Sequence, residues 1–157
     1  MRRFLHSLRS VGMSLALLEN VLELALRTSL IKGESKVTDE IFEEAFETFN
    51  SGERKQWDAA LLERTARHEA GHAFMCWYGG EVPSYLTVVA RSGHGGYMQH
   101  ANQEERMGYT RQELLGRIRT ALGGRAAETV CYGEEDGLST GASGDLATAT
   151  HIARHIL

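Results

Sequence analysis

Two histidines, His68 and His72, lie four residues apart and enclose Glu69 in a segment whose sequence favours an α-helix. On a helix, residues four apart share one face, so both imidazoles are able to reach a single zinc ion. Glu69 projects beside that ion rather than onto it, where a carboxylate is placed to take a proton from water that the metal activates. The spacing therefore predicts two zinc ligands and a general base.

This HExxH pattern is rare by chance. From the numbers of histidine and glutamate residues, we expect roughly 0.03 random matches in a chain of this length. The alternative interpretation is that two histidines merely decorate a helix face. Ala70 and Gly71 also suit close packing of this helix against a neighbour, a structural role that does not compete with metal binding.

A catalytic zinc site needs a third protein ligand and one open position. Cys76 lies one turn beyond His72, but one helix is poorly suited to supply three ligands of a tetrahedral ion, so we interpret Cys76 as a core residue. Glu128 would give a site of two histidines and one glutamate, and Asp145 a site of two histidines and one aspartate. An aspartate at the start of a helix is also a common capping residue. The residues alone leave Glu128 and Asp145 open.

The elements that must position these residues are mostly helical. Apolar residues at helical spacing predict helices over residues 14–32, 38–49, 57–78, 110–130 and from about 145 to the last residue. Leu22, Leu26 and Leu30 belong to the apolar face predicted for the first helix. Thr110 and Glu113 have the form of a capping box. Residues 133–144, rich in glycine, serine and acids, are predicted to form a loop.

A small β-hairpin is predicted between the third and fourth helices. Residues 85–90 are rich in β-branched and aromatic side chains, and a glycine-rich turn separates them from a second short strand at 96–99. His94 and His100 are possible metal ligands, but in and beside such a turn we expect them to be solvated.

Composition narrows the class of protein. The chain has 157 residues, 42% of them hydrophobic and 24% charged, which is typical of one globular domain or of a small module with part of another. A net charge of −4 argues against a partner bound through phosphates, so no nucleic acid is expected. The most apolar stretch is interrupted by charged residues, so no membrane segment is expected. Two cysteines exclude a disulfide scaffold and favour a reducing compartment.

Three linked segments together resemble the FtsH-type ATP-dependent zinc metalloproteases: HEAGHA at 68–73, LGGRAAE at 122–128 and STGASGDL at 139–146. Residues 12–46 resemble the helical lid that ends this family's AAA ATPase module. The resemblance implies that His68, His72 and Asp145 hold zinc and that Glu69 is the general base. The resemblance also implies that Glu128 is a helix residue near the site, where it would support one of the zinc ligands.

The resemblance also implies the architecture. We expect an α+β, mostly helical fold: an AAA-lid-like helical hairpin over residues 1–50, a linker at 51–57, and a C-terminally truncated zinc-peptidase domain over 58–157. The HExxH helix would pack against the long helix with the capping box. The hairpin would bind an extended substrate through Gly96, Tyr97 and Met98. An ordinary solvent-facing hairpin is the alternative.

The activity implied is that of a zinc metalloendopeptidase that cleaves unfolded polypeptides, with Zn²⁺ as cofactor and an AAA ATPase module as partner in the parent chain or in trans. A homo-oligomer, a hexamer in the family, and a cytoplasmic location are expected. The sequence leaves open whether the parent protein is anchored in a membrane. The chain has no phosphate-binding loop, so we expect no ATP hydrolysis by this chain alone. The alternative is a catalytically incompetent zinc-binding or assembly module that docks on an ATPase.

Overall fold

The computed structural model describes residues 14–92, 94–100 and 108–156. The chain divides into two compact units, the first comprising Met1–Arg54 and Arg91–Gly93 and the second Lys55–Ala90 and His94–Leu157. Within the described residues, no helix is both long and apolar enough to cross a membrane. The fold is mostly helical with one small antiparallel hairpin, which confirms the expected class.

The first unit is built on two packed helices, α2 (Leu15–Ile31) and α3 (Asp39–Ser51). Each begins at a hydroxyl N-cap, Ser14 for α2 and Thr38 for α3, whose side chain accepts a backbone N–H of the first turn. The first thirteen residues of the predicted lid lie outside the described residues. The assignment of residues 1–50 as an AAA lid stays a prediction.

The buried side of α2 differs from the predicted leucine stripe. The helix buries Val21, Ala25 and Ser29, whereas Leu22, Leu26 and Leu30 are 43%, 55% and 75% exposed within the described part of the chain. The two stripes are one residue apart, about 100° around a helix of 3.6 residues per turn. Small side chains on the inner stripe let α3 approach closely, and Ala25 packs there with Ile41 and Ala45 of α3.

The second unit contains the three helices α4 (Ala59–Tyr78), α5 (Arg111–Asp136) and α6 (Ser143–Arg154) and the short 3-10 helix η1 (Thr140–Ala142). The predicted capping box is present at the start of α5. The predicted loop at 133–144 is wrong in part. Gly133, with φ of 85°, bends α5, and a further helical turn follows. The final helix ends at Arg154 with His155 as its C-cap, before the chain end to which it was predicted to run.

The hairpin consists of β1 (Pro83–Thr87) and β2 (Tyr97–His100). Its first strand is shorter than predicted at the carboxyl end. Thr87 pairs with Tyr97, the first residue of β2, so residues 88–90 have no pairing partner in that strand. The backbone N–H of Val89 instead donates to the Thr87 hydroxyl, 3.1 Å away.

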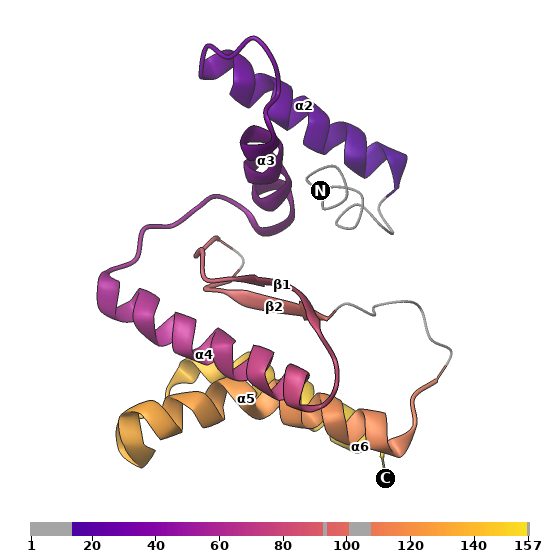
Figure 1. Ribbon diagram of the computed structural model, residues 1–157, viewed down its shortest axis with the longest axis vertical. Helices are drawn as coiled ribbons and strands as arrows, with labels where there is room; N and C mark the ends of the chain where they lie inside the picture. The colour runs from indigo at the N-terminus through magenta and orange to yellow at the C-terminus, as the bar shows by residue number, and fades with distance from the viewer. Residues whose placement is uncertain (1–13, 93, 101–107, 157) are drawn as a thin grey trace. The chain divides into compact units, whose positions relative to one another are not determined.

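Close packing of α4 on α5 decides where the histidines lie. An added Cβ at Gly71 would lie 2.3 Å from the Gly123 carbonyl oxygen, and one at Gly123 would lie 2.5 Å from the Gly71 carbonyl oxygen. The two helix backbones therefore touch at this glycine pair. Figure 1 shows α4 with the hairpin on one side and α5 on the other, with α6 packed on α5.

Candidate metal centre

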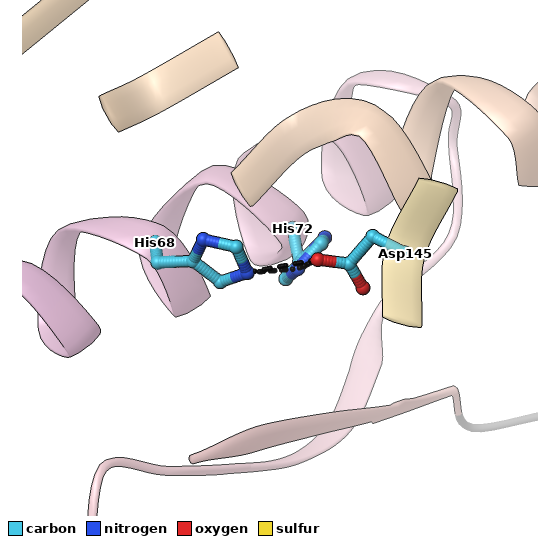
Figure 2. A group of neighbouring side chains, drawn as sticks. All are labelled: His68, His72 and Asp145. Atoms are coloured by element: carbon cyan, nitrogen blue, oxygen red, sulfur yellow. Dashed lines mark hydrogen bonds and ion pairs between the residues drawn. The ribbon is translucent and has the colours of Figure 1, made fainter. Parts of the chain in front are cut away.

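Three side chains from two helices converge on one point. His68 and His72 come from successive turns of α4, and Asp145 comes from the first turn of α6 (Figure 2). The Nε2 atoms of the histidines are 3.0 Å apart, and Oδ2 of Asp145 lies 2.9 Å from Nε2 of His68 and 3.4 Å from Nε2 of His72. Of the two acids left open by the residues alone, Asp145 is therefore the one that joins the histidines.

The far nitrogen of each imidazole is held by an acceptor. Nδ1 of His68 lies 2.6 Å from Oε1 of Glu128, and Nδ1 of His72 lies 2.8 Å from the Thr120 carbonyl oxygen. A carbonyl oxygen only accepts, so this contact places the proton of His72 on Nδ1. The Gly124 backbone nitrogen is also near Nδ1 of His72, at 3.3 Å, but the shorter carbonyl contact decides the tautomer. The Nε2 atoms of both rings thus face the Asp145 carboxylate.

Glu128 occupies a supporting position. Its side chain is 3% exposed, and while Oε1 meets His68, Oε2 accepts hydrogen bonds from Arg64 at 2.7 Å and from the Ser139 hydroxyl at 3.0 Å. Arg64 also donates to the Asp136 carbonyl oxygen at 2.8 Å. A carboxylate on the outer nitrogen of a ligating histidine orients the ring and raises its basicity.

The charges of the group favour a cation at the point of convergence. The hydrogen bond to Asp145 raises the pKa of His68 to about 9, against the effect of burial. Burial acts to raise the pKa of Asp145, but hydrogen bonds from His68 and His72 outweigh it and lower that pKa to about 2. Positive charge is therefore stabilised where Nε2 of each ring meets the Asp145 carboxylate.

The donor set fits zinc. Imidazole and carboxylate are ligands that zinc accepts, and bonds of about 2.0–2.1 Å in a tetrahedron place ligand atoms about 3.4 Å apart. The three observed separations, 2.9, 3.0 and 3.4 Å, are within about half an ångström of that value. Space for the ring of His68 depends on Gly124, where an added Cβ would lie 2.5 Å from Nε2. The three residues present are thus able to hold zinc and leave one position open.

Glu69 lies near the three converging side chains and near Gly96, the residue before β2. It is 6% exposed, and burial raises the pKa of its carboxyl group. An added Cβ at Gly96 would lie 2.9 Å from Cγ of Glu69 and 2.8 Å from the Thr87 carbonyl oxygen. Gly96 therefore lets the hairpin approach Glu69 closely.

The other sequence-predicted residues lie outside this group of three. Tyr97 and Met98 lie on β2 beside Gly96 and are half-buried. Cys76 is buried, which confirms its interpretation as a core residue, with an exposed fraction of 1%. His100 is not the solvated turn residue expected from the sequence, because it lies on β2 and contacts Glu81 and Cys76.

Comparison with known families matches residues 57–157 to the model of peptidase family M41. The chain belongs to peptidase family M41. Among its M41 relatives is a protein of Mycoplasmopsis pulmonis named ATP-dependent zinc metalloprotease FtsH, which is 36% identical over 95% of this chain and 21% of its own length.

Two more M41 relatives carry similar names. The ATP-dependent zinc metalloprotease FtsH of Corynebacterium glutamicum is 36% identical over 95% of this chain and 18% of its own length. The ATP-dependent zinc metalloprotease FtsH 3 of Sphaerobacter thermophilus is 36% identical over 93% of this chain and 30% of its own length. The chain thus spans less than a third of the length of these relatives.

Several residues around the candidate metal centre were not found from the sequence. The Thr120 contact uses a backbone carbonyl, for which no side-chain signal exists. Arg64 precedes His68 by four residues, so the two share one face of α4. This spacing was the available signal that Arg64 is able to reach the same acid as His68, namely Glu128 of the second motif. Gly124 belongs to the glycine pair of the second motif. Its close contact with His68 follows only from the packing of α4 on α5, which the sequence does not specify.

Proposed function

We propose that this chain is the zinc-bearing part of a metalloendopeptidase that hydrolyses peptide bonds of unfolded polypeptides. The observation that carries the proposal is the convergence of the two Nε2 atoms of α4 with the Asp145 carboxylate, with both Nδ1 atoms bound to acceptors. In this proposal His68, His72 and Asp145 hold Zn²⁺. Family membership and the names of the relatives support the same chemistry.

When bound, zinc would supply Lewis-acid chemistry, polarising the scissile carbonyl and acidifying the attacking water. Glu69 takes the proton at its carboxylate and delivers it to the leaving amine nitrogen. Its burial supports this role, because a raised pKa lets the carboxyl group hold a proton between the two transfers. Glu128 and the Thr120 carbonyl orient the two imidazoles.

The hairpin is the proposed substrate-binding element. The sheet has two strands, and an extended peptide is able to bind a sheet by adding a further strand at its edge through main-chain hydrogen bonds. We assign Gly96, Tyr97 and Met98 to this role because Gly96 lies against Glu69. Recognition through the main chain requires an extended, unfolded segment and depends little on its side chains.

The wider setting follows from resemblance. We propose that residues 1–50 are an AAA-lid-like hairpin, that 51–57 link it to the peptidase part at 58–157, and that an AAA ATPase module in the same or another chain delivers the substrate. The name of the M. pulmonis relative, an ATP-dependent protease, supports this. A homo-oligomer, a hexamer by resemblance, and the cytoplasm are the proposed assembly and compartment.

Glu69→Gln tests the assignment of the base. The variant removes the proton acceptor but leaves the three ligands, so we expect cleavage of a fluorescently labelled unfolded protein to fall by at least about 100-fold. Zinc content by elemental analysis should not change. Glu63→Gln, an exposed position on the same helix, is the control and should keep full activity.

Retained cleavage in Glu69→Gln would contradict the role of the base. If the wild-type chain binds zinc but cleaves no unfolded protein, even with an added ATPase partner, the alternative of an incompetent zinc-binding or assembly module replaces the proposed activity. Loss of zinc in Asp145→Ala is also expected. Unchanged zinc affinity in that variant would remove Asp145 from the ligand set.

A further inference from the structure

The described residues bring together a second group of metal-ligating side chains, one turn further along α4. Sγ of Cys76 lies 3.7 Å from Nδ1 of His100, and Oε2 of Glu81 lies 3.0 Å from the same nitrogen. All three ligand atoms are within 4.8 Å of one another. Sulfur, nitrogen and oxygen donors therefore meet at one point.

Glu81 is placed by the way α4 ends. Gly80 adopts a left-handed conformation, with φ of 86°, and its N–H donates to the Trp77 carbonyl oxygen at 2.9 Å. The N–H of Glu81 then donates to the Cys76 carbonyl oxygen at 3.1 Å. These two bonds form a Schellman motif, which turns the chain back over the last helical turn. The backbone of Glu81 is thus fixed beside that of Cys76.

His100 is placed by the hairpin. It pairs with Pro83 at the end of β2, and the Ser84 hydroxyl lies within hydrogen-bond distance of the carbonyl oxygens of both Gln99 and His100. Three separate backbone segments, the end of α4, the turn that follows it and the end of β2, therefore hold the three donors. The group does not depend on one flexible loop.

We propose that Cys76, Glu81 and His100 bind a second divalent ion of the zinc class. Bonds of about 2.3 Å to sulfur and 2.0–2.1 Å to nitrogen in a tetrahedron put the two ligand atoms about 3.6 Å apart, close to the observed 3.7 Å. Soft thiolate together with imidazole selects zinc over magnesium or calcium. Binding would displace the thiol proton to solvent.

The exposure of the three residues suits an ion that enters from solvent. Cys76 is 1% exposed, whereas the side chains of His100 and Glu81 are 24% and 51% exposed. The sulfur thus forms the floor of the site, and the carboxylate lies at its mouth. A fourth position would face water.

The ion would act as a structural link. A hairpin of two strands is marginally stable by itself in water. The proposed ion joins the carboxyl end of β2 to α4, the helix that carries His68 and His72. It would therefore hold the strand that we assign to substrate binding, without being part of the catalytic group.

Cobalt substitution tests this site separately from the first one. Only a thiolate ligand gives a near-ultraviolet sulfur-to-cobalt charge-transfer band, and the catalytic group contains no sulfur. The Co²⁺-loaded wild-type chain should show the band, and His72→Ala should keep it. Cys76→Ser should abolish the band, while Cys131→Ser, at an exposed cysteine outside the group, should not change it.

Metal content gives the second readout. We expect two zinc ions per wild-type chain and one in Cys76→Ser, and zinc affinity of the second site should fall roughly 10-fold or more in Glu81→Gln. Absence of the charge-transfer band in the wild-type chain, or equal zinc content in wild type and Cys76→Ser, would overturn the proposal. Because the band reports the sulfur site alone, it is decisive even if His72→Ala fails to fold or the chain cleaves no substrate.

Discussion

Both ring nitrogens of His68 contact a carboxylate: Nδ1 lies 2.6 Å from Glu128, and Nε2 lies 2.9 Å from Asp145. Two carboxylates on one imidazole have different consequences because only the Nε2 side also meets His72. At the residue scale, the ring nitrogen that an acid contacts therefore separates a proposed zinc ligand, which meets Nε2, from an acid that only orients the ring, which meets Nδ1. Arg64 and Ser139 complete the support by binding the other oxygen of Glu128.

This distinction predicts different effects for the two acids. Glu128→Gln keeps the shape of the side chain but removes the charge that faces His68 and Arg64, so zinc affinity should fall about 10–100-fold while the site still fills at high zinc. Asp145→Ala should lose zinc. Titration with a chromophoric zinc chelator measures both.

Glu134→Gln is the matched control for this pair, because Glu134 is exposed on the same helix as Glu128. Its zinc affinity should equal that of the wild-type chain. The opposite order, with zinc lost in Glu128→Gln and kept in Asp145→Ala, would make Glu128 the third ligand.

At the scale of elements, the approach of α4 to α5 is set by residues that lack side chains. Gly71 and Gly123 allow each backbone to reach the carbonyl of the other helix. The approach brings the Thr120 carbonyl to His72, and Gly124 leaves room for the ring of His68. The contact between α4 and α5 therefore does more than pack the two helices, because it also places the groups that orient His68 and His72.

Two glycine substitutions in α5 should have opposite effects on stability. Gly123→Ala forces a Cβ to 2.5 Å from the Gly71 carbonyl oxygen, so we expect a loss of about 1–3 kcal/mol in the free energy of unfolding. Gly116→Ala meets only the end of the Arg119 side chain at 4.0 Å and should gain about 0.5–1 kcal/mol through helix propensity. Denaturant unfolding compares them, and equal effects would contradict the packing account.

At the scale of the whole molecule, the proposed metal centre belongs to one of the two compact units. All three proposed zinc ligands lie in the second unit, where Asp145 is the ligand that comes from α6. An ion held by α4 and α6 would therefore oppose local opening of α6. The first unit contributes none of these three ligands.

Removal of zinc should therefore act on one unit. When the concentration of free zinc exceeds the dissociation constant of the site about 100-fold, zinc binding suppresses about 100-fold those openings of α6 that require release of the metal. Amide hydrogen exchange of α6 should accelerate by up to that factor on chelation, whereas exchange in α2 and α3 should stay constant and serves as the internal control. Equal acceleration in both units, or none in α6, would contradict the assignment of Asp145.

Local sequence was enough for the features whose physical causes are local. The spacing of His68 and His72, the helix starts at Ser14 and Thr38, and the capping box at Thr110 depend on residues within one or two turns, and the structure has all of them on the expected elements. The motifs were also enough to indicate the family, which the comparison confirms.

Only the tertiary structure shows which nitrogen of the His68 ring Glu128 and Asp145 each contact. Both acids follow His68 by more than fifty residues, and which ring nitrogen each meets depends on how α5 and α6 pack on α4. The same holds for the buried side of α2 and for the length of β1, which a partner helix and a partner strand determine. Contacts between distant segments are a property of the packed chain, because no local pattern specifies the rotation and distance of one element relative to another.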